Sequence, residues 1–191
     1  MDINIELKEL LVLLEQLQSS ATVFIRYFSF SEGEMELSFS VSEREGEGKV
    51  AEEKIREVLR QFPSRWVTVS KGMSFDDGIE YEIRFHRLPC CPISTSTEVK
   101  DKYDSLFLVI SQFWGYPYPI NIQLEERSIV LFILSFHMPN PRMLAKKIIA
   151  LLDEEGLSYC IQNGYERYIS PQEKEILYSK ERDQGIVISL G

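Results

Sequence analysis

Hydrophobic and polar residues follow two different periods along the first half of the chain, which predict two helices and four strands. Apolar residues recur at helical spacing from Leu7 to Leu17 and again from Ala51 to Phe62. Elsewhere they alternate with polar residues, the period of half-buried strands, as in the run that starts at Met35. The predicted order is helix 3–18, strand 23–30, strand 35–41, loop 43–48, helix 51–62, strand 66–70 and strand 79–85.

The second half repeats this kind of pattern after a stretch rich in proline and hydroxyl residues at 87–97. Residues 98–113 have helical spacing, although their apolar core LFLVI is also compatible with a strand. Asn140 and Pro141 are typical of a helix start, and the run SPQE at 170–173 is a capping box. The predicted order is helix 98–113, strand 120–124, strand 128–137, a helix from Pro141, strand 157–162, helix 170–184 and strand 186–190.

Three groups of residues in the first half match three groups in the second at offsets of 95, 93 and 92 residues. The matched groups are Met35, Leu37, Phe39 and Val41 with Val130, Phe132, Leu134 and Phe136; Ala51, Ile55, Val58 and Leu59 with Leu144, Ile148, Leu151 and Leu152; and Val67, Val69 and Gly72 with Tyr159, Ile161 and Gly164. This repetition predicts an α+β fold of two similar α-β-β-α-β-β halves of the ferredoxin-like, strand–helix–strand–strand type. The second half has one extra helix. The alternative is two unrelated stretches of generic α+β structure.

The proline-containing stretch also sets the expected division of the chain. An N-terminal half is expected at 1–88, a linker at 89–97 and a C-terminal half at 98–191. The order strand, helix, strand, strand, present twice, is similar to the duplicated module of gyrase-inhibitor-like small-molecule-binding domains. This resemblance of element order implies a ligand site in the groove between the halves.

The charge of the chain argues against nucleic acid and membrane surfaces as direct partners. The chain has 21 Lys and Arg against 30 Asp and Glu, a formal net charge of −9, whereas both kinds of surface require clustered positive charge. No run of 18 or more apolar residues is present, so no membrane span is expected. The three cysteines have no framework spacing, which favours reduced thiols and a cytoplasmic location.

Residues that could carry out chemistry are few. The weak metal alternative consists of His86, Cys90 and Cys91, but adjacent cysteines make a poor pair of tetrahedral zinc ligands. The other catalytic alternative is a thiol nucleophile, Cys90 or Cys91, with His137 as its base. The chain has no Gly-x-Ser-x-Gly motif and no glycine-rich phosphate loop. We therefore expect no cofactor, no assigned metal and no catalytic residue, and a role other than catalysis.

A dense aromatic segment is the candidate binding site. Phe113, Trp114, Tyr116 and Tyr118 occur with two prolines within seven residues. Large rigid side chains of this kind are favoured at interfaces, and they are equally suited to pack a helix end on the sheet. The sequence leaves both roles open.

The C-terminal region resembles archaeal bacterio-opsin-activator-type regulators, in the segment just ahead of and entering their helix-turn-helix. The resemblance rests on LAKKIIALLDEEG at 144–156, LSYCIQ at 157–162 and YISPQEKEIL with a later glycine at 168–185. After Gly185 only six residues follow, too few for a recognition helix. The resemblance therefore implies a sensory or protein-contact portion of such a regulator.

These observations predict a cytoplasmic, non-enzymatic regulatory or adaptor protein. It would bind a protein partner or a small ligand at the seam between its two halves. One alternative is a cysteine-dependent enzyme. Another is a transcription-associated factor related to the archaeal regulators but without its own DNA-reading helix.

Overall fold

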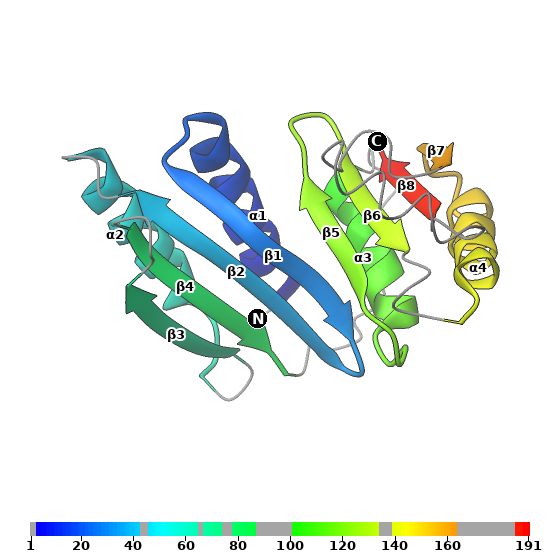
Figure 1. Ribbon diagram of the computed structural model, residues 1–191, viewed down its shortest axis with the longest axis horizontal. Helices are drawn as coiled ribbons and strands as arrows, with labels where there is room; N and C mark the ends of the chain where they lie inside the picture. The colour runs from blue at the N-terminus through cyan, green and yellow to red at the C-terminus, as the bar shows by residue number, and fades with distance from the viewer. Residues whose placement is uncertain are drawn as a thin grey trace, which may run out of the picture.

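The computed structural model of the chain is a two-layer α+β fold, with an antiparallel sheet covered on one face by helices (Figure 1). The structure describes residues 3–42, 46–64, 67–73, 78–86, 101–133, 139–163 and 186–191. Within them the helices are α1 (Ile3–Ser19), α2 (Glu47–Leu59), α3 (Lys102–Phe113) and α4 (Pro141–Glu154). The strands are β1 (Val23–Ser31), β2 (Glu34–Ser42), β3 (Val67–Met73), β4 (Gly78–Phe85), β5 (Ile120–Leu124), β6 (Ile129–Ile133), β7 (Tyr159–Asn163) and β8 (Ile186–Leu190). No helix among these residues has the length and apolar character needed to cross a bilayer.

The structure confirms the predicted α+β fold class, and among the described residues the two halves have the same element order. The N-terminal half runs from α1 to β4 and the C-terminal half from α3 to β8, each as α-β-β-α-β-β. Their strands form one sheet in the order β3-β4-β2-β1-β5-β6-β8-β7. This order is mirrored about the β1–β5 junction, which we call the seam. A shared origin of the halves stays a prediction.

Local signals place the helices of the C-terminal half. Residues 102–113 form a helix and not a strand, because Asp101 and Asp104 make a complete capping box. At the start of α4, the side chain of Asn140 accepts a hydrogen bond of 3.1 Å from the backbone N–H of Met143. In the N-terminal half, α2 begins at Glu47, inside the run 43–48 predicted as a loop, with an acidic residue in its first turn.

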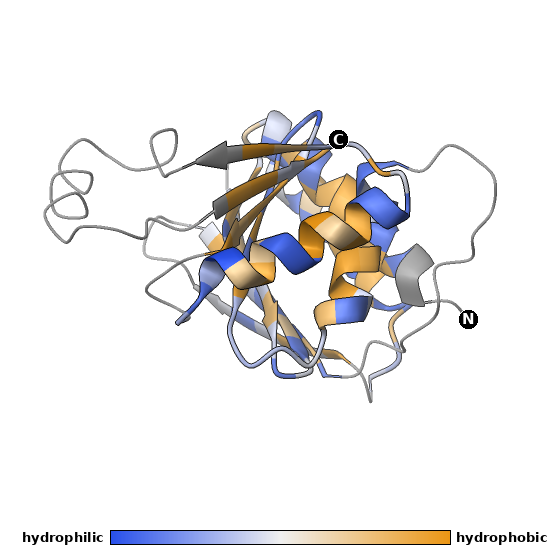
Figure 2. Ribbon diagram, turned by 90° about the vertical axis from the view of Figure 1, so that its right-hand side faces the viewer, coloured by the Kyte–Doolittle hydropathy of each residue, from blue (hydrophilic) through white to orange (hydrophobic). Residues whose placement is uncertain are grey.

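The core lies between the helices and the inner face of the sheet (Figure 2). One part of the predicted repeat is wrong, because the alignment of β2 with β6 is one residue out of phase. Met35 and Leu37 face the core from β2, but in β6 the residues that do so are Ile129, Leu131 and Ile133. The uniformly apolar sequence of β6 has no alternation from which its phase could be inferred.

Two predictions fall on residues that the structure does not describe. The linker at 89–97 and the extra helix at 170–184 both lie outside the described residues. The strand predicted at 128–137 is described as β6 over 129–133.

Candidate functional site

The helices cover one face of the sheet, and we call the opposite face the outer face. In the N-terminal half its side chains form rows across β1, β2, β4 and β3. Successive rows are Phe24, Ser40, Glu80 and Gly72; Tyr27, Ser38, Glu82 and Ser70; and Ser29, Glu36, Arg84 and Thr68. Apart from the two aromatic residues, every position in these rows is polar or glycine. An antiparallel sheet can leave such a face in contact with water.

A β-bulge explains why both aromatic residues lie on the outer face. In a regular strand, residues 24 and 27 would point to opposite faces, because side chains alternate. The register shifts between Ile25 and Tyr27, so Arg26 is the extra residue of the bulge. As a result Phe24 and Tyr27 share the outer face, with 54% and 40% of their surfaces exposed.

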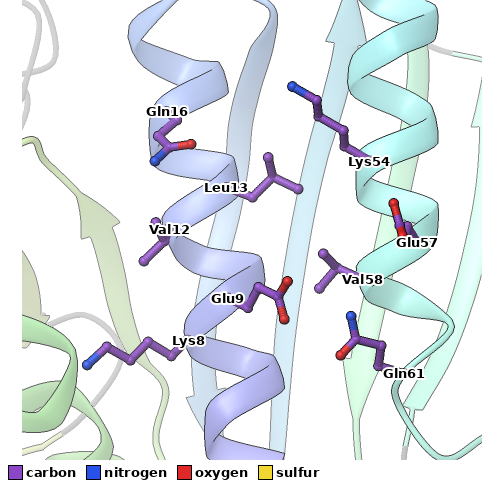
Figure 3. A pocket seen from close by; sticks show the side chains of 9 residues that line it. All are labelled: Lys8, Glu9, Val12, Leu13, Gln16, Lys54, Glu57, Val58 and Gln61. Atoms are coloured by element: carbon purple, nitrogen blue, oxygen red, sulfur yellow. The ribbon is translucent and has the colours of Figure 1, made fainter.

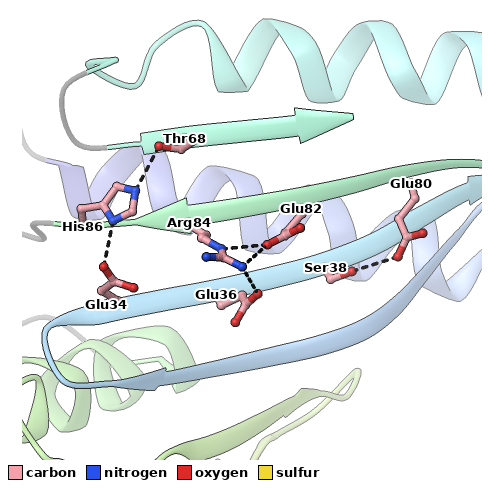
Figure 4. A network of polar contacts seen from close by, with 8 residues as sticks. All are labelled: Glu34, Glu36, Ser38, Thr68, Glu80, Glu82, Arg84 and His86. Carbon is pink, nitrogen blue, oxygen red and sulfur yellow. Dashed lines mark hydrogen bonds and ion pairs between the residues drawn. The ribbon is translucent and has the colours of Figure 1, made fainter. Parts of the chain in front are cut away.

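Next to the aromatic residues, the outer face carries a polar network on β2 and β4 (Figure 4). Arg84 donates from Nε to Glu82 at 2.7 Å and from Nη2 to Glu36 at 3.3 Å. The hydrogen bond that Arg84 donates to Glu82 and the charges of Glu82 and Glu36 raise the pKa of Arg84 above its ordinary value. His86 hydrogen-bonds to Glu34 at 3.1 Å and extends the network along β4. The surface is therefore dominated by carboxylates.

The outer face of the C-terminal half has a different character. Its residues include Asn121 and Gln123 in β5, Val130 and Phe132 in β6, and Val187 and Ser189 in β8. None of these six residues carries a charge. Val130 and Val187 are 0% and 1% exposed, so this part of the outer face is not a water-facing surface.

At the seam, the two halves of the sheet are joined by a short strand pairing. β1 and β5 pair at Ser29↔Asn121 and Phe30↔Ile120. On the helical side, Lys102 of α3 donates to Glu15 of α1 at 2.6 Å and to the carbonyl of Glu125 at 2.6 Å. These contacts fasten the two halves together through both layers.

A buried phenol completes the contact between α1 and α3. The hydroxyl of Tyr103 donates to the same oxygen of Glu15 that Lys102 contacts. Burial and the neighbouring Glu15 carboxylate raise the pKa of Tyr103 far above its ordinary value of 10.0. Tyr103 is therefore a neutral donor at any pH near neutrality.

The predicted aromatic segment lies at the seam, where it packs against the core. Phe113, Trp114, Tyr116 and Tyr118 are half-buried, and the ring centroids of Tyr116 and Tyr118 are 5.9 Å apart. The carbonyls of Trp114 and Tyr116 accept hydrogen bonds of 2.8 Å each from the turn between β1 and β2. The segment thus has a clear structural contact, and its role in binding stays a prediction.

A groove on the helical layer lies within the N-terminal half, between α1 and α2 (Figure 3). It holds about 670 Å³, and its apolar lining consists of Val12, Leu13 and Val58. The rim carries charges of both signs, among them Lys54 and Glu57. This mixture does not select one class of ligand.

The residues of the metal and thiol alternatives are only partly described. His86 hydrogen-bonds to Thr68 and Glu34, and Cys160 is an exposed free thiol. Cys90, Cys91 and His137 lie outside the described residues. Within the described part of the chain, no three His, Cys, Asp or Glu side chains are grouped as metal ligands.

Sequence reasoning missed Phe24 and Tyr27. The run from Val23 to Phe30 is mostly apolar and aromatic, interrupted by Arg26 and Ser29, and this spacing does not assign Phe24 and Tyr27 to one face. A usable signal lay in the neighbouring strands, where Glu34, Glu36 and Ser38 occupy every second position. That pattern indicates a face of the sheet in contact with water.

Comparison with known proteins adds no relative: the chain matches no protein-family model, no curated protein and no solved structure.

Proposed function

We propose that the protein is a non-enzymatic regulatory or adaptor protein that binds a protein partner beside its seam. The observation that carries this proposal is the exposure of Phe24 and Tyr27 on one face of the seam strand β1. Exposed aromatic side chains of this kind are enriched where proteins bind each other, since they bury a large area at low entropic cost. The proposal includes a cytoplasmic location, with neither nucleic acid nor membrane as a direct partner.

The surroundings of the two aromatic residues support a binding surface. Phe24 lies opposite Ser40 and Tyr27 opposite Ser38, so each ring stands beside a small side chain. A large side chain beside small ones stands clear of its neighbours and offers a partner an apolar contact. The resemblance of 144–185 to the contact portion of archaeal regulators agrees with this role and forms part of the proposal.

The test is site-specific photo-crosslinking in the cells from which the sequence derives. A benzophenone amino acid is introduced at Tyr27 and, in a matched control, at Val50, which is 52% exposed on α2 in the helical layer. We expect a discrete protein adduct from position 27 that is not formed from position 50. The substitution Phe24→Ser should remove most of that adduct while the folded protein keeps its circular dichroism spectrum.

Two outcomes would refute the proposal. Position 27 could give no adduct, or positions 27 and 50 could capture the same proteins in equal amounts. Either result would show that the outer face beside the seam is not a specific interface.

A further inference from the structure

We propose that the partner of the N-terminal outer face is a protein segment rich in Lys and Arg. This inference rests on the proposed function and assigns the chemistry of the partner. The docking surface comprises Phe24 and Tyr27 together with Glu34, Glu36, Ser38, Glu80, Glu82 and Arg84. All of these side chains lie on the outer face.

The charge of this surface favours a cationic occupant. On β2 and β4 it has the four carboxylates of Glu34, Glu36, Glu80 and Glu82 and the one guanidinium of Arg84, a formal charge of −3 with His86 neutral. Counting the exposed Arg26 in the bulge of β1, the formal charge is −2. Arg84 is already held by Glu82 and Glu36. An approaching cation therefore meets an excess of acceptors on this surface.

Two carboxylates at opposite ends of the surface, Glu34 and Glu80, are well placed to accept hydrogen bonds from a bound segment. The side chain of Glu34 is 58% exposed. Glu80 accepts a hydrogen bond of 3.4 Å from the neutral hydroxyl of Ser38. Both oxygen pairs can accept further hydrogen bonds from Lys or Arg, because an ionised carboxylate has about four acceptor sites.

The spacing of apolar and acidic positions fits a polypeptide better than a small ion. Phe24 and Glu80 lie in one row, and Tyr27 and Glu82 lie in the next, each pair separated by one intervening strand. The separation between aromatic and acidic positions is thus about 10 Å, two strand spacings. A segment with apolar and basic side chains can contact both at once, whereas a single small cation cannot.

The contrast within the molecule places the occupant on the N-terminal half. The corresponding outer face of the C-terminal half carries no charge at its six named positions, and Val130 and Val187 are buried there. Electrostatic attraction would therefore guide a basic segment to one end of the sheet only.

The test measures binding of two fluorescent peptides by anisotropy. Each is about ten residues long, enough to cross the four strands of this half when extended. One peptide alternates Leu with Lys and Arg, and the other has Glu at every basic position. We expect the whole protein to bind the basic peptide, with affinity falling as salt rises from about 0.05 to 0.15 M, and not the acidic one.

Matched variants locate the binding surface. The triple variant Glu34→Gln, Glu36→Gln, Glu82→Gln should bind the basic peptide about tenfold more weakly. The control Glu9→Gln, Glu53→Gln, Glu57→Gln removes the same charge from exposed positions of α1 and α2, and its affinity should change less than about twofold. The variant Phe24→Ser, Tyr27→Ser should also weaken binding.

Several results would overturn the proposal. Equal losses in the two triple variants would show that net charge alone attracts the peptide. Similar affinity for both peptides, or no binding of the basic one, would exclude a basic partner. Competition by spermine at equal charge concentration would indicate a general cation surface. If an adduct still forms at Tyr27, the proposed function stands and only the partner class is refuted.

Discussion

Glu36 in β2 and Val130 in β6 occupy equivalent places in the two halves of the sheet, but their surroundings differ. Each lies between two core residues of its strand, and each pairs with the last strand of its half, at Arg84 and Ser189. Glu36 belongs to a water-facing polar network, whereas Val130 is fully buried. Two halves with one topology therefore carry different outer faces. Fold class alone does not define which face of such a sheet can bind a partner.

The strongest test of this comparison exchanges the two residue types. Val130→Glu would bury a carboxylate with no basic partner at its named neighbours, and we expect it to lower the free energy of unfolding by about 3–5 kcal/mol. Glu36→Val removes one contact of an exposed ion pair and should change the free energy of unfolding by less than about 1 kcal/mol. Urea denaturation of both variants measures the difference.

The milder variant Val130→Thr serves as a control if Val130→Glu does not fold. It should still cost more than Glu36→Val, because its hydroxyl is buried. Equal effects at positions 36 and 130 would contradict the contrast between the two outer faces.

The helical layer shows a second difference between the halves. In α2 the side chain of Glu52 accepts from Lys71 at 2.6 Å and from Tyr81 at 2.7 Å, which ties the helix to β3 and β4. The residue 93 positions later is Ala145, which packs in the apolar core. We expect Glu52→Gln to lower the free energy of unfolding by about 1–3 kcal/mol at neutral pH.

This effect should depend on pH in a defined direction. The hydrogen bonds from Lys71 and Tyr81 lower the pKa of Glu52 below its ordinary value of 4.5, although burial opposes them. A lowered native pKa stabilises the fold above the unfolded-state pKa, and the stabilisation is lost as pH falls through the native value. The difference between wild type and Glu52→Gln should therefore shrink below pH 4.5. A difference that stays constant into acid would contradict this role of Glu52.

The smallest expected effect concerns the seam that joins the halves. Gly33 has a φ of +83°, and its backbone N–H donates to the carbonyl of Trp114 at 2.8 Å. Gly33→Ala should cost about 1 kcal/mol through the left-handed backbone, since an added Cβ would meet Trp114 only at an ordinary 3.6 Å.

Gly115→Ala is the matched control in the same contact region. Gly115 does not have a positive φ, and an added Cβ there would meet no atom within 4 Å. Its substitution should change the free energy of unfolding by less than about 0.5 kcal/mol. If Gly115→Ala lowered the free energy of unfolding more than Gly33→Ala did, the left-handed backbone at Gly33 would not be the cause of the destabilisation.

Most elements of the fold were predictable from the sequence because their signals are local. The alternation around Leu37 and the cap at Asn140 each act over a few residues. The phase of β6 was not predictable, because the sequence IVLFI suits either face of a strand.

The candidate surface was less predictable than the fold. Sequence reasoning selected Trp114 and its neighbours, since dense aromatic runs suit both interfaces and packing, and these residues are half-buried against the core. The exposure of Phe24 and Tyr27 depends on one irregular residue and on partner strands distant in sequence. Such a feature is fixed by tertiary pairing and not by the local pattern.

The bulge at Arg26 divides β1 into two segments that differ in which alternate residues face the core. Before it, odd-numbered residues such as Val23 enter the core; after it, even-numbered ones such as Phe28 do so. Loss of that single residue would give β1 one regular alternation of side chains along its whole length. Both segments would then keep their present faces, because Val23, Ile25, Phe28 and Phe30 would occupy alternate positions along the strand. Homologous chains should therefore tolerate a deletion at position 26, with Phe24 and Tyr27 still on the outer face.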